Sequence, residues 1–141
     1  MISPPPDSGS PPGTAEPRSP GRPPLEASTA QTLEQYKAEV ALAVLHANAE
    51  HTFIGPLPEI LKSVVVLRVA IDRNGFPYEV ALVRSNGYRD LEARAMQSVR
   101  ASALPRPGGA VTGGHGYVSF LETWLVRDDG KFQIRTLAGP Q

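Results

Sequence analysis

The sequence contains no cysteine and carries no formal net charge. Without cysteine the chain has neither disulfide bonds nor thiolate chemistry, and this absence is compatible with any cellular compartment. The 14 basic side chains are balanced by 14 acidic ones. A general nucleic-acid binder draws its affinity from an excess of lysine and arginine at the phosphates. The charge balance therefore argues against that class, although it leaves room for a local basic patch.

Long apolar runs are also missing. A helix that crosses a bilayer needs about 20 predominantly apolar residues, and the longest apolar run, Val64–Ile71, is interrupted by Arg68. The N-terminus shows neither the charged nor the apolar region of a signal peptide. If the protein works at a membrane, we expect its anchor to be missing from this sequence or to belong to a partner.

Proline, by contrast, is abundant near the N-terminus. Nine of the 15 prolines lie between Pro4 and Pro24, among serine, glycine and threonine. Such a segment buries too little apolar surface to offset its ordering entropy, and it favours polyproline II. We therefore predict a disordered proline-rich spacer over residues 1–28 and a folded domain over residues 29–141. The spacer is either a simple disordered tail or the end of a longer proline-rich segment.

Apolar spacing predicts a first helix at the start of the folded domain, roughly Thr29–Glu50. A Ser28–Gln31 or a Thr32–Gln35 pair would form a capping box at its N-terminus. The apolar residues recur three and four positions apart, as an amphipathic helix requires. They are Leu33, Tyr36, Val40, Val44 and Ala47.

Two alternating runs on either side of Asn74-Gly75 predict a β-hairpin, with strands Ser63–Asp72 and Tyr78–Val83. The first strand is apolar on one face and half apolar on the other, so we expect it at the centre of the sheet. Pro77 lacks an N–H donor, so the second strand should begin at an unpaired edge.

The second half of the chain predicts one more helix and two more strands. The helix covers Asp90–Ala103, with Asp90 as its cap, and prolines follow it. After the glycine-rich loop Gly108–Gly116, strands are expected over Tyr117–Arg127 and Lys131–Thr136. This order predicts an α+β fold, in which two helices pack on one face of a small three- to four-stranded antiparallel sheet.

Residues that suggest catalysis or metal binding are few. His46 and Glu50 are four positions apart and could share a metal ion, but such a pair is usually a solvated helix face. His115 lies among glycines and suits a turn better than a catalytic base. The glycine-rich loop lacks the Gly-Lys-Ser/Thr ending of a phosphate-binding loop. Because no acid, base and nucleophile converge, we predict that the protein is not an enzyme and holds no metal or cofactor.

Five short segments give the sequence a family resemblance that covers roughly Tyr36–Thr136. The segments are Tyr36 opening a helix, Asp72–Gly75, Val83–Gly87, Leu91–Ala95 and Leu104–Pro107. With these segments the sequence resembles the C-terminal domain of TonB-type energy transducers, and TolA C-terminal domains are similar in layout. Two departures are clear. The transmembrane anchor of the family is absent, and Gly55–Pro58 stands where a Tyr-Pro pair often precedes the first strand.

The resemblance implies a periplasmic adaptor that is attached to the inner membrane in its full-length form. In this family a proline-rich spacer and one N-terminal membrane helix connect the domain to an ExbB–ExbD-type proton-driven motor. The domain binds the TonB box, a short peptide of an outer-membrane receptor, by adding it as a strand beside its own last strand. Such strand addition gives affinity through backbone hydrogen bonds and selectivity through alternate side chains. We expect a monomer, with weak dimerisation as the alternative.

The expected partner-binding residues lie on the last two predicted strands, and we expect the final strand to be the open edge. On the third strand a row that contains Val118, Phe120 and Trp124 either packs in the core or lines part of a groove. Two other functions stay open: a TolA-like or secretion-apparatus envelope component, and a small enzyme or metal-binding domain that uses His46, Glu50 and His115. The candidate residues are Tyr117, Ser119, Leu121, Thr123, Trp124, Lys131, Gln133 and Arg135.

Overall fold

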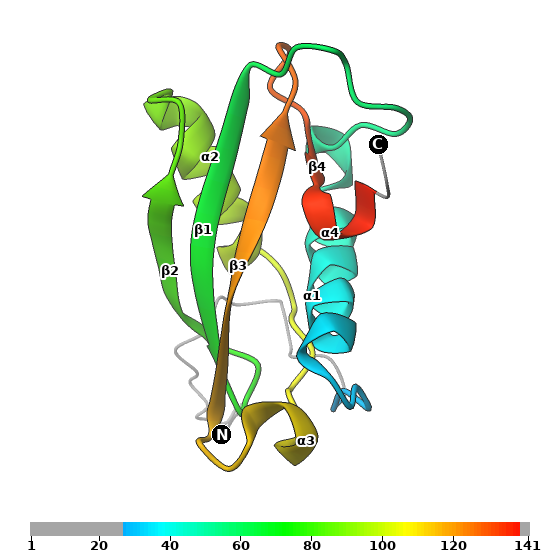
Figure 1. Ribbon diagram of the computed structural model, residues 1–141, viewed down its shortest axis with the longest axis vertical. Helices are drawn as coiled ribbons and strands as arrows, with labels where there is room; N and C mark the ends of the chain where they lie inside the picture. Colours follow the sequence, from blue (N-terminus) through cyan, green and yellow to red (C-terminus); the bar gives the residue numbers. More distant parts are fainter. Residues whose placement is uncertain (1–26, 139–141) are drawn as a thin grey trace, which may run out of the picture.

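A computed structural model describes residues 27–138 of the chain (Figure 1). The predicted spacer therefore lies outside the described residues, apart from Ala27 and Ser28. The helices and strands, in chain order, are α1 (Leu33–Ala47), the 3₁₀ helix η3 (Ala49–His51), β1 (Ser63–Asp72), β2 (Pro77–Arg84), α2 (Arg89–Arg100), α3 (Gly109–Thr112), β3 (Tyr117–Val126), β4 (Phe132–Ile134) and α4 (Arg135–Ala138).

The four strands form one antiparallel sheet in the order β2-β1-β3-β4, so β1 lies inside the sheet as its apolar pattern predicts. The ladder between β1 and β3 is regular over ten residue pairs, from Ser63 opposite Val126 to Asp72 opposite Tyr117. The ladder between β1 and β2 contains two register shifts. Pro77 begins β2, which is an edge strand, as its missing N–H predicts.

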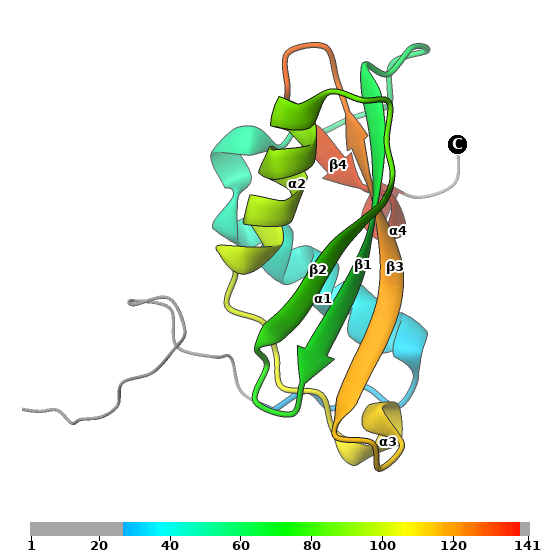
Figure 2. The same cartoon turned by 90° about the vertical axis from the view of Figure 1, so that its left-hand side faces the viewer.

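Helices α1 and α2 lie on the same face of the sheet, which Figure 2 shows edge-on. Helix α2 packs on β1 and β2, and α1 lies beside it toward β4. The opposite face, turned toward the viewer in Figure 1, is called the open face below. The α+β fold with two helices on one face of an antiparallel sheet is therefore confirmed.

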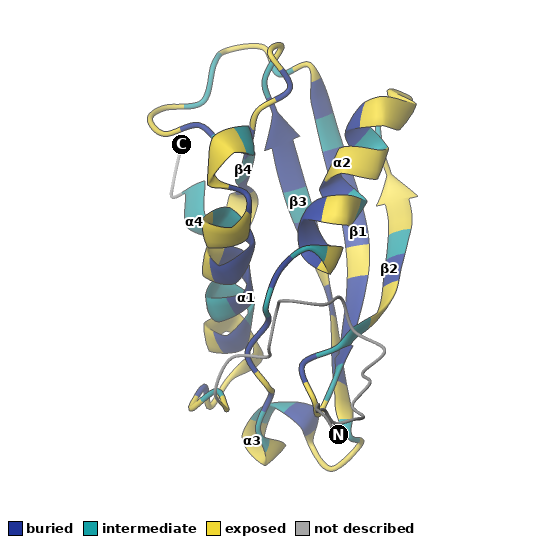
Figure 3. Ribbon diagram, turned by 180° about the vertical axis from the view of Figure 1, so that it is seen from behind, coloured by how far each residue is buried: buried dark blue, intermediate teal, exposed yellow. Residues whose placement is uncertain are grey.

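The core lies between this helix layer and the sheet (Figure 3). Alternation along the strands sends every second side chain of β1 and β3 into it. On β3 the row that contains Phe120 and Trp124 is buried, so core packing is confirmed for these two side chains. The largest fully buried side chains are Trp124, Tyr36, Phe132, Leu67, Ile71 and Leu104.

The first helix begins later than predicted, at Leu33, because Thr32 is its N-cap residue. The hydroxyl of Thr32 accepts a hydrogen bond from the N–H of Gln35 at 3.1 Å. The side chain of Gln35 bonds back to the N–H of Gln31, one residue before the cap, so the reciprocal half of the capping box is displaced. At the other end the helix stops at Ala47, and residues 49–51 form the separate η3.

The second helix starts one residue before the predicted cap, so the capping role assigned to Asp90 is wrong. Tyr88 occupies the N-cap position and makes no side-chain hydrogen bond there. Asp90 lies in the first turn, where its negative charge favours the positive end of the helix dipole. An acidic residue near a helix start thus marks the first turn as readily as the cap.

A buried polar network joins both helices to the sheet. The indole N–H of Trp124 donates to Ser98 Oγ on α2 at 3.0 Å. The carbonyl oxygen of Ser98 accepts bonds from Asn48 Nδ2 at 3.0 Å and from Ser102 Oγ at 2.7 Å. Because these groups are buried, each bond offsets the cost of removing a polar atom from water. The network connects the C-terminal ends of α1 and α2 to β3.

A second buried bond ties α1 to the chain that leaves α2. The hydroxyl of Tyr36 donates to the carbonyl oxygen of Pro105 at 2.6 Å, and its ring meets Phe120 edge-on. Burial raises the pKa of Tyr36 well above its ordinary value, so the hydroxyl stays protonated and remains a donor. The hydrogen bond thereby connects two segments that lie 69 residues apart.

Candidate functional site

The outer edge of β4 is occupied, so the prediction that the final strand is the open edge is wrong. Thr52 forms a parallel bridge with Phe132, and the N–H of Phe53 donates to the carbonyl oxygen of Phe132 at 3.2 Å. Gln133 Nε2 donates to the carbonyl oxygens of Phe53 and Gly55 at 3.2 and 2.8 Å. The segment 52–55 thus runs along β4 as a cover.

The predicted last strand is also too long. Lys131 lies between the hairpin turn and β4, and β4 comprises only Phe132–Ile134. Arg135 and Thr136 belong to the short helix α4 instead. The two-residue alternation therefore ends where the backbone turns back toward α1.

The outer edge of β2 has no partner strand among residues 27–138, but its backbone is irregular. Pro77 supplies no donor, and register shifts interrupt the ladder next to Leu67 and Ile71. Bulges and prolines of this kind are common protection against pairing at exposed edges. The β2 edge is therefore a poor template for a further strand.

The outer edge of β3 is both open and regular. Strand β4 pairs only with Trp124–Val126, so Tyr117–Thr123 has no partner strand on its outer side within the described residues (Figure 1). The carbonyl of Val126 bonds to Lys62 on the β1 side, and the N–H of Arg127 bonds to the β4 side. Backbone groups alternate between the two sides of an antiparallel strand. Those of Ser119 and Leu121 consequently point outward.

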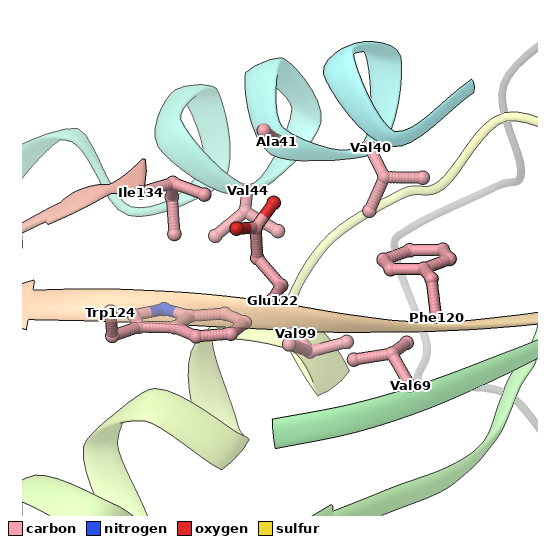
Figure 4. Close-up of a pocket in the computed structure, with 9 residues that line it drawn as sticks. All are labelled: Val40, Ala41, Val44, Val69, Val99, Phe120, Glu122, Trp124 and Ile134. Atoms are coloured by element: carbon pink, nitrogen blue, oxygen red, sulfur yellow. The ribbon is translucent and has the colours of Figure 1, made fainter. Parts of the chain in front are cut away.

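Glu122 marks the inner end of this open stretch. Its Oε2 accepts a hydrogen bond from the N–H of Thr123 at 2.9 Å, and its Oε1 accepts one from the hydroxyl of Thr136 on α4. The residue is only 7% exposed. Figure 4 shows its carboxylate directed toward α1, beside a cavity of about 10 Å³. The Glu122 carboxylate thus already accepts from the Thr123 N–H, which is the backbone donor that an added strand would need at this point.

The candidate site is therefore the backbone edge Tyr117–Thr123, called the β3 edge below. Tyr117, Ser119 and Leu121 are exposed on the open face, and Thr123 is half-buried beside them. Trp124 is 1% exposed under the helices, so it does not face a partner. The side chain of Gln133 is held by the cover of β4. Lys131 and Arg135 are exposed, but they lie beyond the β3 edge.

Glu122 is the one residue of this site that sequence reasoning missed, although a signal was present. It stands in phase with Phe120 and Trp124, so the alternation of β3 directs it into the core. An acidic residue in a buried row needs hydrogen-bond partners. The partner on α4 lies 14 residues further along the chain, where the sequence pattern predicts more strand.

Aromatic side chains gather at the outer end of the β3 edge, on the open face. The rings of Tyr78 and Tyr117 meet edge-on, with centroids 6.1 Å apart, and the His115 ring lies 6.2 Å from that of Tyr117. On the helix face, Lys37 Nζ lies 5.7 Å from the centroid of Phe120. An extended chain beside β3 would therefore meet different side chains on its two faces.

We expect Thr136→Val to lower the free energy of unfolding by about 1–3 kcal/mol, because the substitution leaves the buried Glu122 Oε1 without its donor. Urea unfolding followed by circular dichroism measures this change. Thr29→Val, at an exposed threonine outside the helices and strands, serves as the control. Equal unfolding free energies for Thr136→Val and the parent would show that the bond contributes nothing.

The turn between β3 and β4 predicts a low titration midpoint for Asp129. The Arg127 guanidinium bonds to this carboxylate, and the N–H of Lys131 donates to it, which lowers the pKa of Asp129 from 3.8 to about 2. A depressed pKa means that the pair adds stability above the unfolded-state pKa and loses it as pH falls toward 2. A carboxyl-detected NMR titration should show this midpoint, and Arg127→Gln should raise it. A midpoint that Arg127→Gln leaves unchanged would contradict the pairing.

The other candidate residues are not assembled into a site. His46 lies in the last turn of α1, and Glu50 lies in η3, where it faces His51 at 3.9 Å. His115 is in the loop before β3. Between residues 27 and 138, no three histidine, cysteine, aspartate or glutamate residues gather as a metal site would require.

No helix within the described part of the chain has the length and apolar character needed to cross a bilayer. Comparison of the chain with protein-family models, with curated proteins and with solved structures finds no match in any of the three.

Proposed function

We propose that the chain is a non-enzymatic adaptor domain that binds an extended peptide by adding it as a strand to the β3 edge. The observation that carries the proposal is the contrast among the three edges. Segment 52–55 covers the β4 edge, bulges interrupt the β2 edge, and the β3 edge is regular and has no partner strand within residues 27–138. Unpaired backbone groups along a regular edge are what β-augmentation requires.

The side chains around the β3 edge support selectivity as well as affinity. Alternate residues of an added strand would face the open side, near Tyr117 and Leu121, and the helix side, near Phe120 and Lys37. Tyr117 and Leu121 are 44% and 47% exposed, so each offers apolar surface to a bound side chain. Glu122 limits the pairing to the residues before Thr123.

The resemblance to TonB-type C-terminal domains supports a specific setting for this binding. In that setting the chain works in the periplasm, and its peptide is the TonB box of an outer-membrane receptor. An ExbB–ExbD-type motor would pull on the domain through a proline-rich spacer and an inner-membrane anchor. Several hydrogen bonds along one strand would share such a load. The protein would therefore couple a proton-driven motor to an outer-membrane transporter.

Titration of the ¹⁵N-labelled chain with a peptide that carries the TonB box of a receptor, called the receptor-box peptide below, tests this proposal. We expect the largest amide shifts at Ser119 and Leu121, because their backbone N–H groups would gain acceptors. A peptide of the same composition in scrambled order is the control. Shifts confined to β2 or to the helices, with none on β3, would overturn the assignment of the edge.

A further inference from the structure

A second surface feature lies on the open face and shares only Thr123 with the β3 edge. The strand register places Arg84, Val66 and Thr123 side by side across β2, β1 and β3. Around them is a shallow hollow of about 490 Å³, whose wall includes Asn86 and Arg135. Its floor is made of the short side chains of β1 and β3. The hollow thus spans three strands at the end of the sheet nearest to the start of α2.

The hollow is cationic even though the chain has no net charge. Arg84 and Arg135 are exposed, and neither lies within 4.0 Å of a carboxylate among residues 27–138. Arg68 is also exposed on this face, two residues along β1 from Val66. The carboxylate of Glu92 on α2 accepts a hydrogen bond from Ser85 Oγ. Glu79 lies farther along the sheet, opposite Ala70.

The wall of the hollow adds a neutral donor. Asn86 Oδ1 accepts a hydrogen bond from the N–H of Val64 at 2.8 Å, which fixes the amide side chain at the end of β1. The amide NH₂ of Asn86 makes no hydrogen bond within the described residues. Two guanidinium groups and one amide NH₂ therefore surround a small apolar floor. Guanidinium groups bind carboxylates through paired, charge-assisted hydrogen bonds.

We propose that this hollow binds an acidic, extended segment of a protein partner, with carboxylates held by Arg84 and Arg135. Arg84 on β2 and Arg135 just after β4 flank the β1–β3 floor, so they lie three strand spacings apart, or about 14 Å. Side chains two and four residues apart share one face of an extended chain and lie about 7 and 13 Å apart at their backbone, so two long glutamate side chains reach both arginines. The methyl groups of Val64 and Val66 would contact the aliphatic stems of those glutamates.

The shape of the hollow favours a polypeptide over the other sources of negative charge. No aromatic side chain lines it, so a nucleobase would find no stacking surface. Small-molecule sites usually bury about 70–90% of their ligand, whereas this hollow is shallow and lies on an open sheet face. An extended segment gains affinity from several weak contacts across such a surface, and its charges match those of the hollow.

The test uses the full 141-residue chain and an acetylated, amidated peptide in which three glutamates alternate with valines. We expect the peptide to bind and to shift the NMR signals of Val64, Val66 and Asn86. The double substitution Arg84→Gln/Arg135→Gln should weaken it by roughly tenfold or more, as expected when charged hydrogen bonds are lost. Arg106→Gln, at an exposed arginine beyond α2, is the matched control, and a peptide with glutamine for glutamate should not bind.

Each other outcome would overturn the proposal. Unchanged affinity in the double variant, or an equal loss in Arg106→Gln, would mean that the peptide does not use the hollow specifically. Binding of inorganic phosphate or of phosphatidylglycerol vesicles without binding of the glutamate peptide would assign the arginines to another anion. The proposal treats this hollow as independent of strand addition. Ser119→Pro should therefore leave the affinity for the glutamate peptide unchanged, and the double variant should leave the affinity for the receptor-box peptide unchanged.

Discussion

Trp124→Ala is expected to lower the free energy of unfolding by about 3–5 kcal/mol, the usual cost of removing a large buried aromatic side chain. The residue is 1% exposed, and its indole N–H is bonded to Ser98. The substitution would empty the space beneath both helices and leave Ser98 Oγ without its donor. Because whole domains are stable by only about 5–15 kcal/mol, this loss is a large share of the total.

Urea unfolding followed by far-ultraviolet circular dichroism measures this change, because Trp124 is the only tryptophan and its fluorescence disappears with it. Trp124→Phe keeps most of the ring volume and removes only the donor, so we expect it to cost about 1–3 kcal/mol. Tyr117→Ala removes an exposed aromatic ring from the same strand, and surface changes usually cost within about 0.5 kcal/mol. An equal cost for Trp124→Ala and Tyr117→Ala would contradict the placement of Trp124 in the core.

Ser119→Pro is expected to weaken receptor-box binding by roughly tenfold or more while the fold is kept. The N–H of Ser119 points away from β1, and proline is tolerated in edge strands where its missing N–H would face solvent. The proline ring would remove one hydrogen-bond donor and occupy the space that an added strand needs. Isothermal calorimetry with the receptor-box peptide measures the affinity.

Ser119→Ala is the matched control, because it removes the hydroxyl and keeps the N–H. We expect it to bind the peptide like the parent chain. A thermal melt of both variants establishes that the β1–β3 ladder persists. Parent-like affinity in a folded Ser119→Pro variant would show that the peptide does not pair with β3 at this residue.

The sequence predicts the fold well where the determinants are local. The Asn74-Gly75 turn is an example, because Gly75 has a φ of +82°, a conformation that glycine adopts readily. Pro77 marks an edge strand for an equally local reason, its missing N–H. Alternation along β1 and β3 places the core residues because each strand has one face toward the helices.

Which strand edge is open could not be predicted from the sequence in the same way, because long-range contacts determine which edge is covered. Gln133 bonds to Phe53 and Gly55, which lie 80 and 78 residues away, and nothing in the alternation of the last strand signals that cover. The end of β4 also depends on tertiary contacts, since Thr136 meets Glu122 across the sheet edge. The sequence therefore predicts a partner surface on the last two strands, which stays a proposal, and it assigns the open edge to the wrong one of the two.

The most direct test of strand addition is an isotope-filtered NOE measurement on labelled protein with unlabelled receptor-box peptide. Pairing with β3 predicts cross-strand contacts from the peptide backbone to the amides of Ser119 and Leu121, and slower hydrogen exchange at both. Contacts from the peptide to β2 or to α1 and α2, with unchanged exchange at Ser119 and Leu121, would contradict the account.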